Sequence, residues 1–262
     1  MKARAIKRAG AAAAGIVVLL PALAGCGSSG GNGSAAAAQS GTNTLPQTSE
    51  PSNLNPADFT TNIDNPYWPM PVGREWHVHV TNPQGESLQE TITVENKTKK
   101  IADGVTARVV HDVVYTGGKP TEITDDWYAQ DSSGNVWYLG EATAEYKNGQ
   151  VASTAGSFEA GVDGAQAGIA MPANPEPGMA YRQEYLKGVA KDKGAVITVG
   201  EEQDEVPFGH YNTDIQMTRD LVPLEPKVQE LKFYAPDVGP LLSVHTDGAG
   251  GRAELVSYTP GK

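Results

Sequence analysis

The strongest constraint on the fold is a two-residue alternation of apolar and polar side chains, which recurs in short runs along most of the chain. Residues 75–80 (EWHVHV) and 88–94 (LQETITV) are clear examples. Successive side chains of a strand point to opposite faces, so such runs place one apolar face against a core. Turn-forming sequences, such as Gly117-Gly118 and Asn148-Gly149, separate the runs.

This pattern predicts an all-β domain built on a single antiparallel curved sheet, half-barrel or barrel-like, with little helix. Only residues 57–62 are expected to form a helical turn. The expected strands cover residues 75–80, 88–94, 107–115, 122–130, 136–139, 181–186, 195–199, 214–218, 228–234, 241–245 and 253–258.

One segment, Gly156–Gly178, follows neither period. It is rich in glycine and proline, with Phe158, Ile169 and Met171 as isolated apolar residues. Long loops of this kind are often binding loops or lids. The alternative is a packed loop that places its apolar residues on the sheet.

The N-terminus combines a basic tip, an apolar stretch from Ala11 to Leu23, and the run Leu23-Ala24-Gly25-Cys26. This order is typical of an export signal. The run resembles the lipobox of bacterial lipoproteins. The resemblance implies that Cys26 becomes the mature N-terminus and carries a diacylglycerol thioether, which anchors the protein to the outer face of the cell membrane.

We therefore expect a lipoprotein signal peptide at residues 1–25, a lipidated disordered tether at 26–56, and an all-β globular domain at 57–262. The tether is rich in Gly, Ser, Ala and Pro, and no aromatic residue precedes Phe59. Such a segment cannot bury enough surface to offset the entropy of ordering it. The chain has a single cysteine, so lipidation leaves neither a disulfide nor a thiolate metal site.

The charge disfavours nucleic acid as a partner. Without the four bases of the signal, the mature chain has 16 Lys and Arg against 31 Asp and Glu, a net charge of −15. Phosphate backbones and anionic headgroups repel such a body. Membrane contact is therefore expected through the lipid on Cys26 alone.

Several motifs of the domain resemble a group of secreted bacterial proteins, and the similarity covers most of residues 64 to 260. The motifs are residues 126–131 (DWYAQD), 134–138 (GNVWY), Gly140-Glu141, 161–165 (GVDGA) and 181–185 (YRQEY). Residues 233–239 (FYAPDVG) are similar to a YAPGVG turn of periplasmic proteins with curved sheets, some of which hold lipid-like ligands. The resemblance implies a fold and brings neither an activity nor site residues.

Glu75, His77 and His79 are the candidate metal ligands, because side chains two apart in a strand share a face. Two imidazoles and a carboxylate suit Zn²⁺ or Cu²⁺, so a divalent metal is the candidate cofactor. The alternative is a solvated outer face opposite Trp76 and Val78. A weaker candidate for Ca²⁺ is an acidic hairpin, whose turn at Asp131 offers oxygen ligands but does not match the spacing of an EF-hand loop. Its acids are Glu122, Asp125, Asp126, Asp131, Glu141 and Glu145.

Trp127, Tyr128, Trp137 and Tyr138 fall in one predicted hairpin and are candidate ligand-binding residues. Aromatic grooves hold sugars, lipids and peptides. The alternative is that these rings fill the core and pair across strands.

The sequence contains no recognisable catalytic or nucleotide-binding motif. We therefore expect a lipid-anchored extracytoplasmic binding protein of the bacterial envelope, non-catalytic, with a small-molecule, lipid-like or protein partner. The alternatives are an envelope metal-binding protein that uses His77 and His79, and a hydrolase with an unrecognised site.

Overall fold

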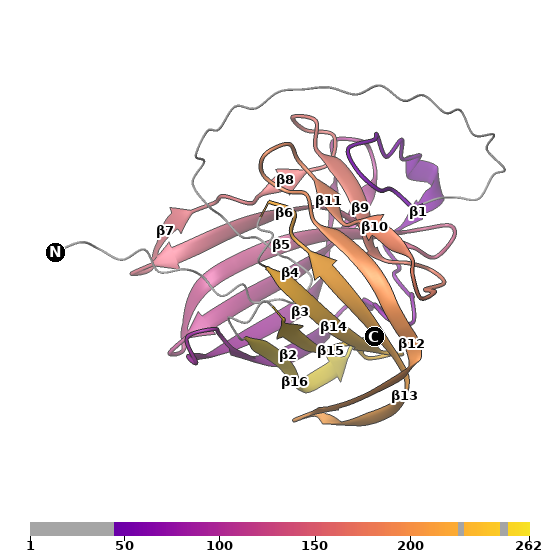
Figure 1. Ribbon diagram of the computed structural model, residues 1–262. Coiled ribbons are helices and arrows are strands. Elements are labelled where there is room, and N and C mark those ends of the chain that lie inside the picture. Colours follow the sequence, from indigo (N-terminus) through magenta and orange to yellow (C-terminus); the bar gives the residue numbers. More distant parts are fainter. Residues whose placement is uncertain (1–44, 225–227, 247–250) are drawn as a thin grey trace, which may run out of the picture.

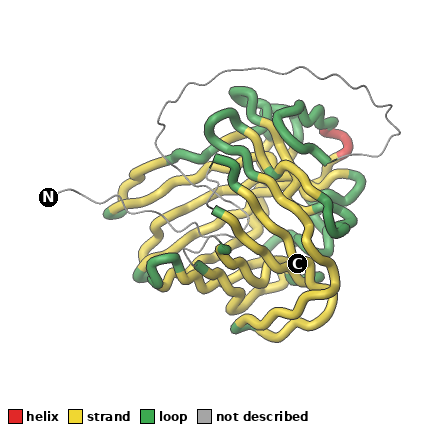
Figure 2. Tube along the Cα trace, viewed as in Figure 1, coloured by secondary structure: helices red, strands yellow, loops and turns green. Residues whose placement is uncertain are grey.

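The computed structural model describes residues 45–224, 228–246 and 251–262, and nearly all of its regular structure is strand (Figures 1 and 2). The helical turn expected at residues 57–62 is a single 3₁₀ turn, η1 (Pro56–Asp58). The strands are β1 (Phe59–Thr60), β2 (Arg74–Thr81), β3 (Ser87–Lys100), β4 (Thr106–Thr116), β5 (Lys119–Asp131), β6 (Val136–Lys147), β7 (Gln150–Ser153), β8 (Phe158–Glu159), β9 (Gln166–Met171), β10 (Ala180–Arg182), β11 (Glu184–Tyr185), β12 (Lys193–Val206), β13 (Gly209–Leu221), β14 (Gln229–Ala235), β15 (Gly239–His245) and β16 (Arg252–Pro260).

These strands form one antiparallel sheet that curls into a nearly closed barrel, as the alternation predicted (Figure 1). The strand order is β10-β12-β13-β14-β15-β16-β2-β3-β4-β5-β6-β9-β11. The last strand, β16, lies between β15 and β2, so it pairs with the first long strand of the sheet. Among the described residues, no helix has the length and apolar character needed to cross a membrane.

One short segment joins the two ends of the sheet. The run predicted as a single strand at 181–186 is split at Gln183 into β10, which pairs with β12, and β11, which pairs with β9. We call residues 180–185 the seam. Its packing requires glycine, because a Cβ on Gly168 would lie 2.3 Å from the carbonyl oxygen of Gln183, and one on Gly194 would lie 2.5 Å from the Tyr181 ring.

The seam also holds the N-terminal segment. Arg182 is 1% exposed, and its guanidinium donates hydrogen bonds to the carbonyls of Thr48, Glu50 and Ala167 and to the Ser52 hydroxyl. The boundary of the folded body is therefore earlier than the expected residue 57, since residues from Leu45 onward lie along the sheet. The rest of the expected tether, the signal and Cys26 lie outside the described residues.

Clusters of buried apolar residues occupy both sides of the sheet. The larger core fills the inside, where Trp76, Val78 and Val80 alternate with the outward His77 and His79, as expected for β2. A smaller core lies on the outside of β4 to β6 and is covered by residues from the N-terminal segment and from the 156–178 segment.

The segment Gly156–Gly178 is packed, so its interpretation as a free binding loop or lid is wrong. It contains β8 and β9, and Phe158, Ile169 and Met171 are each at most 5% exposed. Its apolar residues were too widely spaced to show a strand period, because β8 is only two residues long.

Candidate functional site

Polar and charged side chains line much of the inside of the barrel, and they define the candidate site, which we call the chamber. The charge of Lys232 on β14 lowers the pKa values of Glu90 on β3 and Glu184 on β11. These strands are not neighbours in the sheet, so their side chains approach one another across the inside of the barrel. The buried polar residues of the chamber are Glu90, Asp112, Thr124, Asp126, Glu141, Thr143, Glu184, Asp192, Gln216, Thr218, Asp220, Glu230, Lys232 and Ser243.

A β-bulge in β6 brings Tyr138 and Glu141 to the same face. Three residues apart, they would point to opposite faces of a regular strand. The register shifts there, so that Trp127 pairs with Gly140 and Tyr128 with Tyr138. Gly140 has a φ of 136°, and a Cβ on it would lie 2.4 Å from the carbonyl oxygen of Phe158. Glycine is therefore required for this bulge.

Asp126 and Glu141 lie directly opposite each other across β5 and β6, and both are 1% exposed. The Tyr138 hydroxyl donates a 2.7 Å hydrogen bond to Asp126. Burial raises the pKa of Asp126 to about 7, and burial with the nearby Asp126 charge raises the pKa of Glu141 well above its usual value. Like charges facing each other across strands are destabilising, so this pair favours holding a proton.

Glu90 and Asp112 form a second carboxyl pair on the adjoining strands. When Glu90 is ionised, neither of its oxygens accepts a hydrogen bond from the described residues. Oδ1 of Asp112 accepts none from them either. Burial raises the pKa of Glu90 to about 7, and burial with the charge of Glu90 raises that of Asp112 well above its usual range. At neutral pH the two groups therefore compete for a proton.

The opposite wall, β13 to β15, contains the single buried lysine of the described residues. Lys232 Nζ lies 2.7 Å from Asp220 Oδ2 and 3.5 Å from Glu230 Oε2. The Ser243 hydroxyl donates a hydrogen bond to Glu230. Although burial opposes it, the charges of Asp220 and Glu230 raise the pKa of Lys232 well above its usual value, so Lys232 is charged.

A small cavity of about 30 Å³, partly open to solvent, lies between these walls and the seam. It is lined by Trp68, Tyr138, Ala170, Gln183, Glu184, Asp192, Lys232 and Tyr234. A second cavity of about 20 Å³ shares Trp68, Lys232 and Tyr234 with it.

Two polar groups at this cavity lack a partner among the described residues. The indole N–H of Trp68 and Oε1 of Gln183 make no hydrogen bond to any described residue, although Trp68 is only 6% exposed. Burial, with the charges of Asp192 and Glu141, raises the pKa of Glu184 well above its usual range. Buried polar groups are normally paired, so unpaired ones beside a cavity point to water or a ligand as the partner.

The four predicted aromatic residues are divided between the two faces of the sheet. Tyr128 and Tyr138 point into the chamber, where their rings stack with centroids 5.1 Å apart, and Tyr138 lines the cavity. Trp127 and Trp137 belong to the outer core, where Lys99 Nζ lies 4.2 Å from the Trp127 ring centroid. The predicted ligand-binding role of these four residues stays a prediction, and the geometry favours Tyr138 for it.

The candidate metal ligands lie on the outer face of β2. His77 Nε2 is 2.8 Å from Glu75 Oε1, whereas His79 Nε2 lies 2.9 Å from the Ser87 hydroxyl. The described residues contain no group of three or more His, Cys, Asp or Glu side chains placed to hold a metal ion. The divalent metal stays a prediction, which zinc or copper uptake with and without His77→Ala/His79→Ala would test.

The acidic turn at Asp131 uses its carboxylate for the turn itself. Oδ1 accepts hydrogen bonds of 2.9 Å from the backbone N–H groups of Ser133 and Asn135. Oδ2 accepts from the Asn135 amide and from the indole N–H of Trp137, each at 2.8 Å. These four donors replace the ligand role that the sequence suggested for Ca²⁺.

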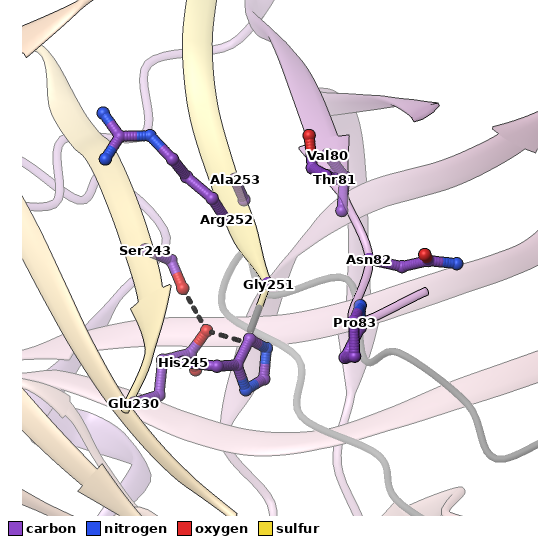
Figure 3. A pocket seen from close by; sticks show the side chains of 10 residues that line it. All are labelled: Val80, Thr81, Asn82, Pro83, Glu230, Ser243, His245, Gly251, Arg252 and Ala253. Atoms are coloured by element: carbon purple, nitrogen blue, oxygen red, sulfur yellow. Dashed lines mark hydrogen bonds and ion pairs between the residues drawn. The ribbon is translucent and has the colours of Figure 1, made fainter. Parts of the chain in front are cut away.

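A shallow pocket at the end of β15 places a serine, a glutamate and a histidine together (Figure 3). Ser243 donates its hydrogen bond to Glu230, and His245 Nε2 lies 3.8 Å from Glu230 Oε1. In a hydrolytic triad the histidine lies between the serine and the acid. Here the glutamate takes that place, so the arrangement does not activate Ser243 as a nucleophile.

The alternation of β3 and β5 contains the one signal that could have located the chamber. Glu90 and Asp126 occupy the same strand phase as the buried Ile92 and Tyr128, respectively. A carboxylate at an apolar position of a strand indicates either a buried site or a break in the pattern. The bulge at Gly140 concealed Glu141, because it shifts the phase of β6.

Comparison with known proteins gives two structural similarities. No protein-family model matches the chain, and no curated protein matches it. A "putative exported protein with YmcC-like fold" from Bacteroides fragilis has 14% identity and a TM-score of 0.45, over 74% of this chain and 99% of that one. A "putative lipoprotein" from Parabacteroides distasonis has 12% identity and a TM-score of 0.39, over the same shares. These TM-scores are too low to support a conclusion about this chain.

Proposed function

We propose that this protein is a non-catalytic binding protein of the bacterial cell envelope, anchored by a lipid on Cys26, and that the chamber is its ligand site. The observation that carries the proposal is the cavity beside Trp68 and Glu184, where buried polar groups face space without protein partners. Cavities with aromatic walls and a few converging polar groups are the usual form of small-molecule sites.

The chemistry of the chamber supports binding over catalysis. Reaction with a substrate would need a nucleophile beside a base, or an acid and a base whose environments separate their pKa values. The carboxyl groups of Glu90, Asp112, Asp126 and Glu141 are instead all shifted in the same direction by burial.

Equilibrium dialysis tests the chamber directly. The full chain with Cys26→Ser is dialysed against the small-molecule fraction of a bacterial culture, and enriched compounds are identified by mass spectrometry. Ala170→Phe fills the cavity, and Ala142→Phe is the matched control because Ala142 is an exposed residue of β6. We expect at least one compound to be enriched by the parent and by Ala142→Phe, but not by Ala170→Phe. Enrichment that Ala170→Phe leaves unchanged, or no enrichment at all, would contradict the proposal.

The anchor is tested separately. Replacing Cys26 by Ser removes the sulfur that lipidation requires, so we expect the folded domain to leave the membrane fraction and enter the medium. If the variant stays in the membrane fraction, the lipid is not what anchors the protein.

A further inference from the structure

We propose that the ligand of the chamber is a small organic amine in its ammonium form, bound between the aromatic rings and the carboxylates around Glu184. This inference rests on the proposed function and names the chemical class of its ligand. Three observations support it: the charge balance of the chamber, the rings that line the cavity, and the unpaired polar groups beside it.

The chamber has far more acidic groups than basic ones. Its buried acids are Glu90, Asp112, Asp126, Glu141, Glu184, Asp192, Asp220 and Glu230, and Lys232 is the buried lysine that faces them. Lys232 is already engaged by Asp220 and Glu230. The carboxyls on the β3–β6 side and the carboxyl of Glu184 are therefore left to be neutralised by protons or by a cation from outside.

The walls of the cavity suit a cation in particular. Trp68, Tyr138 and Tyr234 line it together with Glu184, Asp192 and Lys232, and the Lys232 ammonium is already paired with Asp220 and Glu230. Aromatic faces attract ammonium groups through their quadrupole, most strongly when the cation is desolvated. An anionic ligand would meet carboxylates here, and a purely apolar ligand would leave the polar lining unpaired.

The unpartnered groups identify the hydrogen bonds that the ligand must make. Oε1 of Gln183 lines the cavity and accepts from no described residue. An ammonium group supplies several N–H donors at one point. The unpaired indole N–H of Trp68 adds a single donor, which suits an amine that also carries an oxygen acceptor.

Binding of a cation here should release protons. Burial raises the pKa of Asp126 to about 7 and raises the pKa values of Glu141 and Glu184 above their usual range, and a nearby ammonium group favours the ionised forms. Affinity should therefore increase as the pH rises from 5 to 8. A metal dication would produce the same coupling, so magnesium and calcium chloride serve as separate arms of the test.

Isothermal titration calorimetry of the full chain with Cys26→Ser tests the inference with matched pairs of probes. Ethanolamine, putrescine and glucosamine are each compared with their uncharged counterparts ethylene glycol, 1,4-butanediol and glucose. We expect at least one amine to bind, with its counterpart at least about tenfold weaker, as loss of a charge-assisted hydrogen bond implies. The heat of binding should depend on the ionisation enthalpy of the buffer, which reports the released protons.

Variants connect the binding to the chamber. Glu184→Gln should weaken amine binding by about tenfold or more, whereas Glu75→Gln on the outer face of β2 should not change it. Circular dichroism verifies that both variants are folded.

The outcomes separate the two proposals. Binding of the uncharged probes equal to that of the amines, or binding of the metal dications alone, would overturn the inference. If no amine binds while dialysis enriches a neutral or anionic compound, the inference fails and the proposed function stands. If nothing is enriched or bound, both fail.

Discussion

Both walls of the chamber contain buried carboxyl groups, but only one wall supplies them with a cationic partner. On β13 to β15, Asp220 and Glu230 are paired with Lys232, and the Ser243 hydroxyl completes the set. On β3 to β6, the carboxyls of Glu90, Asp112, Asp126 and Glu141 face one another, and the described residues place no lysine or arginine within ion-pair distance of them.

The comparison shows that burial alone does not fix the charge of an acid. A paired carboxylate can stay ionised in the interior, whereas an unpaired one holds its proton until a cation arrives. The first wall therefore contributes to a defined structure, and the second keeps a capacity to exchange protons or bind cations.

The largest expected effect comes from breaking the paired wall. Lys232→Met removes the cation but preserves much of the volume, so two buried carboxylates lose their partner. We expect the free energy of unfolding at pH 7 to fall by about 3–5 kcal/mol. Urea unfolding followed by tryptophan fluorescence measures it, and the exposed Lys187→Met is the control. A loss below about 1 kcal/mol would mean that Lys232 is not the partner of these acids.

The unpaired wall predicts how stability depends on pH. Folding raises the pKa of Glu90 and Asp126 to about 7, from usual values near 4. The folded state therefore holds more protons than the unfolded state between these values, and stability falls as the pH rises through that window. We expect the melting temperature to be higher at pH 5 than at pH 8. An equal or lower melting temperature at pH 5 would contradict the assignment.

A single isosteric change should remove part of that dependence. Glu90→Gln keeps the shape of the side chain and cannot ionise, so at pH 8 it should stabilise the fold by on the order of 1–3 kcal/mol. At pH 3, where Glu90 is protonated in both states, the variant and the parent should be about equal. Urea unfolding at both pH values measures this, and equal effects at both would show that the charge of Glu90 is not the cause.

The smallest effect is expected outside the chamber. Glu75 and His77 form an exposed pair on β2, with side chains 35% and 45% exposed, so solvent screens their attraction. We expect His77→Ala to change the free energy of unfolding by less than about 0.5 kcal/mol. Thermal melts at pH 6 and pH 8 check this. A loss comparable to that of Lys232→Met would remove the contrast between the inner and outer faces.

The fold was predictable because the alternation of apolar and polar side chains identifies strands even when their pairing partners are unknown. The runs at 75–80 and 88–94 lie within β2 and β3, and their polar residues fall on the outer side as expected, apart from Glu90. The pairing of β10 and β11 with opposite ends of the sheet was not predictable, because it depends on long-range contacts such as those of Gly168 and Gly194.

The site was less accessible to sequence reasoning. Histidines and acids on an outer face or in a turn, such as His77 and Asp131, are easily recognised as candidate ligands. The chamber acids come from separate strands and meet only when the sheet curls. Tyr138 was singled out for its ring, but its neighbour Glu141 depends on a bulge that simple alternation does not reveal.

The position of β16 has a consequence for how the chain folds. Its residues pair with β2 across most of the sequence, from Arg74 opposite Pro260 to Thr81 opposite Arg252. Contacts between such distant residues form slowly, because a long loop must close first. A chain that is still emerging from the ribosome or a translocation channel cannot complete this barrel until its last strand is free. Truncation by ten residues at the C-terminus should therefore abolish the barrel rather than shorten it.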